Sequence, residues 1–228
     1  MAIGVGAGVA ARIDFQTVHD HVDAVINAIA PNDSIARFEG LGVTVLKETA
    51  RFISPTELVA GNHRIRARRF VVATGSRPSL PDIPGLSACQ PLTNESIFEL
   101  TILPEHLLIL GGGPIGLELA QAFRRLGAAV TVVDTGTILD KDEPEAAPLI
   151  RKAFAAEGIA LLENAGITAV NRVDGGVSAI VKTSSGEKTI AASHLLVAAG
   201  RTPNIDDMGL DAAGVNTGRK GIMVDARL

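Results

Sequence analysis

Several residue types are scarce in this sequence of 228 residues, and each scarcity argues against a class of protein. Trp and Tyr are absent and Phe occurs seven times, so no aromatic platform for stacking single-stranded nucleic acid is expected. Cys89 is the single cysteine, which excludes an internal disulfide and a cysteine-rich zinc site and is typical of the reducing cytoplasm. The formal net charge of −4 gives no field to hold a phosphate backbone. We therefore expect no nucleic-acid partner and no metal site.

Long apolar runs are also missing. The longest ones contain Gly or a charged residue, so no membrane span is expected. The first 12 residues lack the cationic region of a signal peptide, and their glycine cluster, Gly4 to Gly8, has too few residues before it to follow a strand. We interpret that cluster as a flexible end and expect a cytoplasmic protein.

Apolar residues make up 46% of the chain, enough to bury one large core or two modest ones. Their helical spacing predicts a helix over residues 14–30 that Pro31 stops. Short alternating runs then predict an antiparallel meander, which leads into an apolar strand over residues 70–73. The runs of the meander are residues 42–46, 57–59 and 64–66.

The second half of the chain alternates predicted strands with predicted helices, after a Pro- and Gly-rich linker at residues 77–85. The predicted helices are residues 114–126 and 145–157. The predicted strands are residues 107–110, 129–133, 159–162, 167–170, 177–181 and 195–199. This order predicts an α/β, Rossmann-like fold whose parallel sheet carries antiparallel β-meander insertions.

The motif that carries chemistry is the sequence GGGPIG at residues 111–116, which joins an apolar strand directly to an amphipathic helix. Gly111 permits a tight turn, Gly113 lets the backbone approach a pyrophosphate, and Gly116 lets the helix pack closely on the strand. The helix N-terminus then offers unpaired N–H groups to phosphates. The alternative is a glycine turn that serves packing alone and binds nothing.

An acidic residue ends the next predicted strand, as a dinucleotide site requires. Asp134 lies 23 residues after Gly111 and can accept hydrogen bonds from a ribose diol, whereas it would repel a 2′-phosphate. No Arg follows in residues 135–138, so NAD(H) is favoured over NADP(H).

Four segments together resemble the FAD-dependent pyridine nucleotide–disulfide oxidoreductase family, in which dihydrolipoamide dehydrogenase and mercuric reductase are similar members. The segments are ATGSRP at residues 73–78, IPG at 83–85, the glycine motif, and AGRTPN at 199–204. The resemblance implies two nested domains: residues 1–103 and 200–228 as a partial FAD-binding domain, and residues 104–199 as an NAD(H)-binding domain.

The resemblance also implies roles for individual residues. Thr74, Gly75 and Ser76 would lie against FAD, and Arg201 near the interface of its domain. Glu118 matches a family glutamate that pairs with a lysine beside the flavin, although in a generic helix it would only complement the dipole. The residues implied to contact NAD(H) are Gly111, Gly112, Gly113, Pro114, Ile115, Gly116, Glu118, Asp134, Ile167 and Gly200.

Other family features have no match in this sequence. They are the first FAD glycine motif, the redox cysteine pair, the lysine partner of Glu118, the later Gly-Asp segment and a dimerisation domain. We therefore expect a central part of a flavoprotein disulfide oxidoreductase that passes hydride between NAD(H) and FAD toward a dithiol or metal-ion acceptor, and expect this part alone to be inactive in the full reaction. The alternatives are a stand-alone NAD(H)-binding module and a remnant without ligand. We also expect some self-association, because residues 70–73 and 195–199 would leave sheet edges unpaired.

Overall fold

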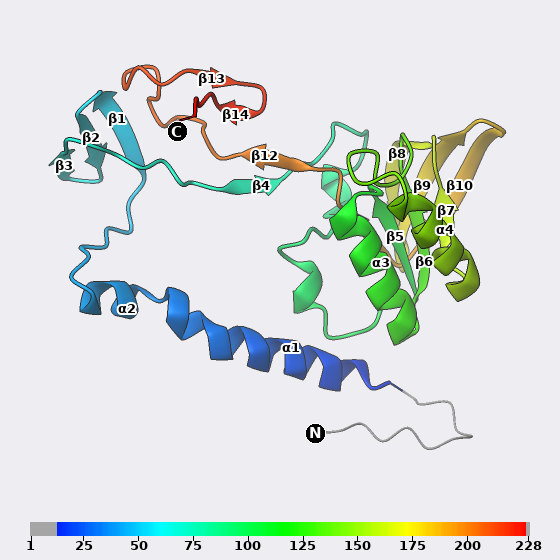
Figure 1. The fold of residues 1–228 in the computed structure, drawn as a ribbon. Helices are drawn as coiled ribbons and strands as arrows, with labels where there is room; N and C mark the ends of the chain where they lie inside the picture. The colour runs from blue at the N-terminus through cyan, green and yellow to red at the C-terminus, as the bar shows by residue number, and fades with distance from the viewer. Residues whose placement is uncertain (1–12, 227–228) are drawn as a thin grey trace. The chain divides into compact units, whose positions relative to one another are not determined.

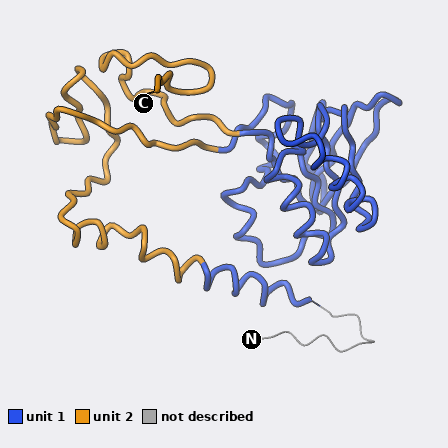
Figure 2. Tube along the Cα trace, viewed as in Figure 1, with its two compact units in different colours: residues 1–25, 78–200 blue, residues 26–77, 201–228 orange. Residues whose placement is uncertain are grey.

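The computed structural model describes residues 13–226 and divides the chain into two compact units (Figures 1 and 2). The first unit contains Pro78–Gly200 together with the N-terminal segment up to Val25, and the second contains Ile26–Arg77 and Arg201–Leu228. In the sequence, the two segments of the second unit thus come before and after Pro78–Gly200. Residues 78–103 belong to the first unit, whereas the domain boundary predicted from the sequence lay after residue 103. Which cofactor each unit holds stays a prediction.

A four-stranded parallel sheet forms the centre of the first unit. Its strands are β5 (His106–Leu110), β6 (Ala129–Val133), β7 (Ala160–Leu162) and β11 (His194–Val197), in the order β11-β5-β6-β7. Most side chains of β5, β6 and β11 are apolar and buried, as expected where both faces of a parallel sheet are covered, whereas the edge strand β7 is only partly buried.

The expectation of an unpaired edge at residues 195–199 was wrong. Leu195 of β11 lies opposite Leu108 of β5 in parallel register, and the far side of β11 forms a bridge to Leu92. The backbone groups of β11 therefore have partners within the unit.

Helices α3 (Pro114–Leu126) and α4 (Ala146–Glu157) cover one face of this sheet (Figure 1). Both end at a glycine with positive φ, Gly127 at 118° and Gly158 at 74°, a conformation that glycine adopts without steric cost. Because side chains alternate along a strand, one set faces these helices. That set includes Leu107, Ile109, Val130, Val132 and Leu196, which pack with Phe123 and Phe154.

A three-stranded antiparallel sheet covers the other face. It consists of β8 (Gly166–Val173), β9 (Gly176–Thr183) and β10 (Gly186–Ala192), in the order β10-β9-β8. The strand β10 was not predicted, since its sequence GEKTIAA is polar and mostly exposed. The alternate side chains of the parallel sheet pack here, namely Leu108, Leu110, Val133, Leu195 and Val197.

The helix α1 (Phe15–Ile29) runs across the boundary between the units and agrees with the predicted helix. The short η1 (Ala30–Asp33) and α2 (Ile35–Gly40) follow it. Two further 3-10 turns, η2 (Ser87–Cys89) and η3 (Ile97–Glu99), lie in the first unit.

The second unit is built from short strands. The meander is β1 (Ala50–Ser54), β2 (Glu57–Ala60) and β3 (His63–Arg66), paired antiparallel in that order. The strand β4 (Ser76–Pro78) pairs with β12 (Arg201–Pro203), and β13 (Thr217–Gly218) pairs with β14 (Gly221–Ile222).

Two predicted strands of the second unit are not strands in the structure. Residues 42–46 and 70–73 carry no strand assignment, and the first strand of the meander is β1 instead. An apolar run becomes a strand only when a neighbouring strand takes up its hydrogen bonds, and within residues 13–226 neither run has such a neighbour. Several of their side chains are open, with Val43 48% and Val71 91% exposed.

Among residues 13–226, every helix is too short or too polar to cross a lipid bilayer. The glycine cluster at residues 4–8 lies outside the described residues.

Candidate functional site

The glycine motif forms the turn between β5 and α3. A Cβ on Gly112 would lie 2.8 Å from Cγ2 of Ile138, and two other glycines of the motif lie directly against backbone. Gly111 has φ +118°, and a Cβ on it would lie 2.4 Å from the carbonyl oxygen of Ala198. A Cβ on Gly116 would lie 2.1 Å from the carbonyl oxygen of Gly111. Any side chain at these two positions would force the helix away from the sheet.

Gly113 is different, because no contact within residues 13–226 requires it to be glycine. Its backbone is extended at φ −79° and ψ 178°, which any residue adopts, and a Cβ there would meet no atom within 4 Å. Gly113 is also the N-cap of α3, and no side chain caps the amides of the first turn. The turn thus presents open space in front of helix N–H groups, with Pro114 and Ile115 exposed beside it.

Asp134 follows β6 and joins that strand end to the glycine turn. Its Oδ2 accepts a hydrogen bond from the Gly112 amide at 2.6 Å, and its Oδ1 accepts one from the Gly136 amide at 2.7 Å. The residue is half-buried. The structure therefore brings Gly111, Gly112, Gly113 and Asp134 together in one site.

The loop at residues 134–139, which we call the acidic loop, is held by an ion pair that the sequence analysis did not single out. Oε1 of Glu163 accepts a hydrogen bond from the Ile138 amide at 2.8 Å. Arg151 of α4 donates to both oxygens of this carboxylate at 2.7 Å. The hydrogen bond from Arg151 holds the pKa of Glu163 below its ordinary value. No motif could have revealed the pair, because the two side chains belong to different elements and meet only in the fold.

The remaining residues implied to contact NAD(H) lie in different surroundings. Glu118 is exposed on α3. Ile167 is 6% exposed, and its side chain packs in the core between the two sheets. Gly200, with φ +112°, is exposed and accepts a hydrogen bond from the Ser79 amide at 2.9 Å.

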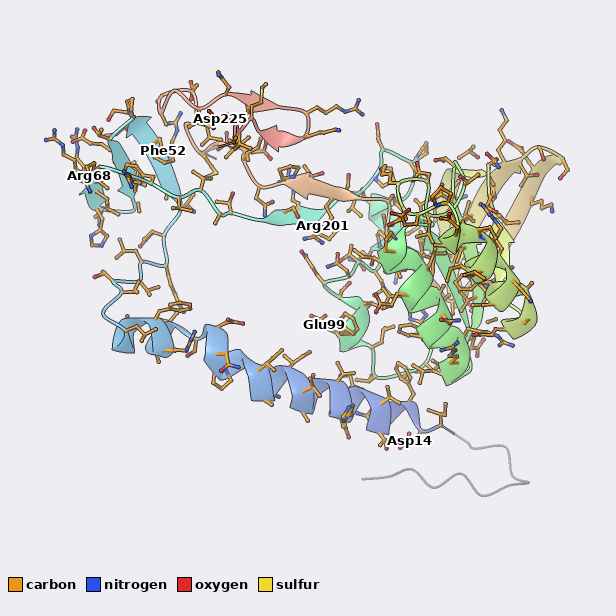
Figure 3. All side chains as sticks on the ribbon, viewed as in Figure 1. Asp14, Phe52, Arg68, Glu99, Arg201 and Asp225 are labelled. Carbon is orange, nitrogen blue, oxygen red and sulfur yellow. The ribbon has the colours of Figure 1, made fainter. Side chains whose placement is uncertain are left out.

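The residues implied to contact FAD lie in the second unit, where they bind one another. The hydroxyl of Thr74 donates to the Asn204 carbonyl at 2.6 Å, and the Asn204 side chain donates to the Thr74 carbonyl at 3.1 Å. Arg201 lies on β12 (Figure 3). Its Nε donates to the Ser76 hydroxyl at 2.7 Å. Gly75, with φ +68°, accepts from the Asn204 amide at 3.0 Å. The ATGSRP and AGRTPN segments are thus tied together across more than 120 residues of sequence.

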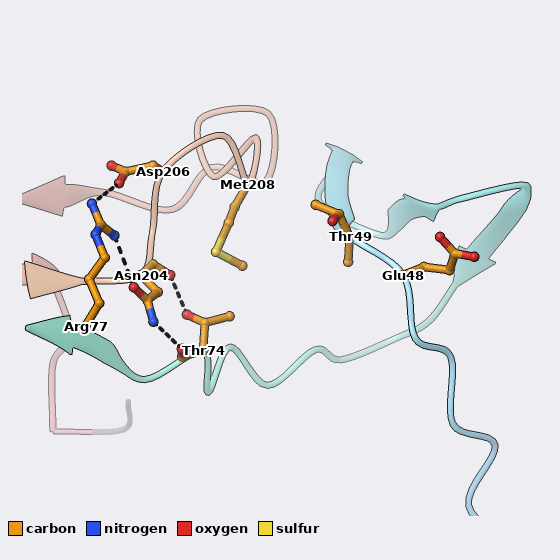
Figure 4. Close-up of a pocket in the computed structure, with 8 residues that line it drawn as sticks. Glu48, Thr49, Thr74, Arg77, Asn204, Asp206 and Met208 are labelled. Atoms are coloured by element: carbon orange, nitrogen blue, oxygen red, sulfur yellow. Dashed lines mark hydrogen bonds and ion pairs between the residues drawn. The ribbon is translucent and has the colours of Figure 1, made fainter. Parts of the chain in front are cut away.

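A cavity of about 350 Å³ opens beside these ties (Figure 4). Arg77 donates to the Asn204 side chain at 3.1 Å and to Asp206 at 2.8 Å, so its charge is already paired. Asn204 is not among the site residues predicted from the sequence, although it stands in the AGRTPN segment. The lining residues are Glu48, Thr49, Ala50, Thr74, Arg77, Asn204, Asp206 and Met208.

Known proteins share both the sequence pattern and the fold. The pattern of the family described as pyridine nucleotide-disulphide oxidoreductase matches residues 7–228. A mercuric reductase from Streptomyces lividans is 41% identical over 169 residues, which are 74% of this chain and 36% of the relative. A mercuric reductase from Lysinibacillus sphaericus is 32% identical over 212 residues, covering 92% of this chain and 39% of the relative.

Solved structures of flavoprotein disulfide reductases have a fold similar to that of this chain. The HOCl-induced flavoprotein disulfide reductase RclA from Escherichia coli matches with a TM-score of 0.82 at 26% identity, over 95% of this chain and 50% of its own. LpdA from Mycobacterium tuberculosis matches with a TM-score of 0.77 at 28% identity, over 93% of this chain and 48% of its own. The chain thus spans half or less of the length of these relatives. Members of the family use FAD and NAD(P)H, and the resemblance and the α/β fold predicted from the sequence are confirmed. This chain belongs to the pyridine nucleotide-disulphide oxidoreductase family.

Proposed function

We propose that this chain is the dinucleotide-binding part of a flavoprotein disulfide oxidoreductase that passes hydride between NAD(H) and FAD toward a dithiol or metal-ion acceptor. Residues 104–199 would bind NAD(H), and residues 1–103 with 200–228 would contribute part of an FAD site. The observation that carries the proposal is the open space at Gly113.

Gly113 distinguishes between two interpretations of the glycine turn: a turn that binds a ligand and a turn that serves packing alone. Packing explains Gly111 and Gly116, because a Cβ at either would collide with backbone. Packing does not explain Gly113, whose Cβ would enter open space in front of the amides of α3. A pyrophosphate placed there would accept those N–H groups and gain from the helix dipole, and a side chain at this position would exclude it.

Asp134 supports NAD(H) over NADP(H). Its carboxylate already accepts two backbone amides, yet each oxygen has a further lone pair that can accept a ribose hydroxyl. A 2′-phosphate in the same place would meet a like charge. Glu118, exposed in the first half of α3, would act at the nicotinamide end, while Gly112, Pro114, Ile115 and Gly200 would form walls of the site. Ile167, whose side chain is buried between the sheets, would contribute its backbone alone.

The second unit fits part of an FAD. The cavity of about 350 Å³ lies at the lower end of the usual range for small-molecule sites. Of the residues that line it, Arg77 alone is cationic, and its guanidinium is bound to Asp206. The cavity therefore suits a ribose or a base rather than the FAD pyrophosphate. We expect weak binding of FAD through Thr74, which lines the cavity, and through Gly75, Ser76 and Arg201 outside its lining.

Bound FAD would supply the electron acceptor for the hydride of NADH. The protein's contribution is to orient the nicotinamide and to keep water away from it. Reduction of a disulfide or a metal ion through a thiol pair needs two cysteines, whereas Cys89 is the only one in these 228 residues and is buried. We therefore expect this chain by itself to be inactive with lipoamide or mercuric ion.

A stand-alone NAD(H)-binding module without catalytic activity is the second candidate. It is favoured by the second unit, where residues 42–46 and 70–73 lie outside any sheet. Their exposed apolar side chains also favour self-association of the chain. We expect the protein to be cytoplasmic.

The visible absorption spectrum of the purified chain, recorded with added FAD and then NADH, separates these candidates. A flavin band that NADH bleaches supports hydride transfer in this chain. Quenching of NADH fluorescence without a protein-bound flavin supports the NAD(H)-binding module. Absence of NADH binding at millimolar concentration would overturn both.

A further inference from the structure

Glu163 directly follows β7 and is the first of three consecutive residues that hold the acidic loop. Its carboxylate accepts from the Ile138 amide at 2.8 Å. The Asn164 amide donates to the Gly136 carbonyl at 2.8 Å, and the Ala165 amide donates to the Asp134 carbonyl at 2.8 Å. Residues 163–165 therefore bind alternate residues of the loop, and Glu163 is the only one of the three that does so through its side chain.

The loop in turn holds the glycine turn. The Leu139 amide, next to Ile138, donates to the Gly112 carbonyl at 3.1 Å, while the Gly112 amide donates to Asp134. Leu139 has φ +54°, a left-handed conformation that is uncommon for a branched apolar residue and has to be held by its surroundings. Glu163 binds the amide of Ile138, the residue immediately before Leu139.

We propose that Glu163, clamped by Arg151, is a positioning residue for the adenosine end of NAD(H), an inference that rests on the proposed function. Arg151 binds both carboxylate oxygens, so the carboxylate has one orientation toward the Ile138 amide. That orientation sets the path of the acidic loop, and the path sets where Asp134 and the Gly112 amide face the ribose and the pyrophosphate. Glu163 acts on the dinucleotide through the loop.

The chain contains a matched control for this ion pair. Glu157, at the end of α4, accepts from Arg125 of α3 through both oxygens, at 3.1 and 2.8 Å. It also binds Gln121 at 2.8 Å. The side chain of Glu157 is 25% exposed and that of Glu163 is 19% exposed, so the two carboxylates are similar in chemistry and burial, whereas Arg125 is more exposed than Arg151. The recorded bonds of Glu157 go to α3 rather than to the acidic loop.

The test compares the unaltered chain with Glu163→Ala, Glu163→Gln and Glu157→Ala by calorimetric titration with NADH and with ADP-ribose, well below each melting temperature. Glu163→Ala is expected to weaken both ligands about tenfold, the equivalent of one lost charge-assisted hydrogen bond. Glu163→Gln, which keeps an acceptor for the Ile138 amide, is expected to fall between Glu163→Ala and the unaltered chain. Glu157→Ala is expected to lower the melting temperature without changing either affinity.

Equal ADP-ribose affinity in Glu163→Ala and the unaltered chain would overturn the positioning role, as would equal weakening in Glu157→Ala. If Glu163→Ala does not fold, Arg151→Ala replaces it, because this variant keeps the acceptor and removes the clamp. Unchanged ADP-ribose affinity in Arg151→Ala would then overturn the role. If the unaltered chain binds no NADH, the proposed function itself fails, an outcome distinct from all of these.

Discussion

The backbone amide of Gly112 and Oδ2 of Asp134 lie 2.6 Å apart, across 22 residues of sequence. This bond joins the turn after β5 to the end of β6, and a second bond ties Oδ1 to the Gly136 amide. Asp134 is thus part of the framework of the turn as well as the candidate acceptor for the ribose. Its substitution should change both stability and binding.

Asp134→Asn tests this double role. The amide side chain has one acceptor oxygen, so its NH₂ group would face a backbone N–H where the second carboxylate oxygen now accepts one. We expect a loss of about 1–3 kcal/mol in the free energy of unfolding, the usual result when a hydrogen-bonded group loses its partner. Chemical denaturation measures it, with the exposed neighbour Asp140→Asn as control. Equal stability of the two variants would contradict the structural half of the role.

Gly113→Ser separates binding from folding. The new Cβ would enter open space, and the hydroxyl would provide an N-cap for α3, so stability should be unchanged or higher by a few tenths of a kcal/mol. The same side chain would fill the space in which the pyrophosphate is proposed to lie, and its hydroxyl would accept hydrogen bonds from the amides proposed to bind the pyrophosphate. NADH affinity should therefore fall at least about tenfold, measured by fluorescence quenching.

Gly116→Ala is the comparison for that variant. Its Cβ would be forced against the Gly111 carbonyl, so α3 must move and the free energy of unfolding should drop by about 1–3 kcal/mol. A Gly113→Ser chain that binds NADH normally would remove the main support for a phosphate site at this turn.

The central sheet was predictable because its signals are local and strong. The limits of α3 follow from Pro114 and Gly127 and those of β6 from its β-branched residues, and the structure agrees with them residue by residue. Residues 70–73 have the same apolar character, yet they form no strand, because pairing depends on a neighbour that the local sequence does not contain. A hydrophobic pattern predicts the tendency to form a strand, but it does not identify the strand with which that segment will pair.

The candidate site was predictable to a similar depth. Its glycines and Asp134 belong to a motif with fixed spacing, so the sequence identifies them. Glu163 and Arg151 lie 12 residues apart on different elements, and their link to Ile138 appears only when the chain is folded. Residues that hold a motif in place from outside it stand at no fixed distance from it in the sequence, so the sequence alone does not identify them.

Asn204→Ala tests whether the second unit acts independently of the dinucleotide site. Asn204 binds Thr74 and Arg77 through its side chain, so its loss leaves the Thr74 carbonyl and the Arg77 guanidinium without these partners. We expect a fall of about 1 kcal/mol in stability and weaker binding of added FAD, with NADH affinity unchanged. Asn171→Ala, at an exposed position of β8, is the control. A parallel loss of NADH affinity would contradict the separation of the two sites.

The ion pair of Glu163 should also appear in the pH dependence of stability. The hydrogen bond from Arg151 lowers the pKa of Glu163 from 4.5, so the folded chain binds its proton less readily than the unfolded chain does. The resulting stabilisation is complete above about pH 4.5 and is lost as the pH falls through the lower pKa of the folded state. Glu163→Gln lacks this titration, so its deficit relative to the unaltered chain should be largest near neutral pH and shrink in acid. Urea unfolding of both proteins from about pH 7 down to pH 3 measures the difference.

Glu157→Gln should show the same trend, because Arg125 lowers the pKa of Glu157 in the same way. A deficit that stays constant across this range would mean that the charge of Glu163 adds nothing to its hold on the acidic loop.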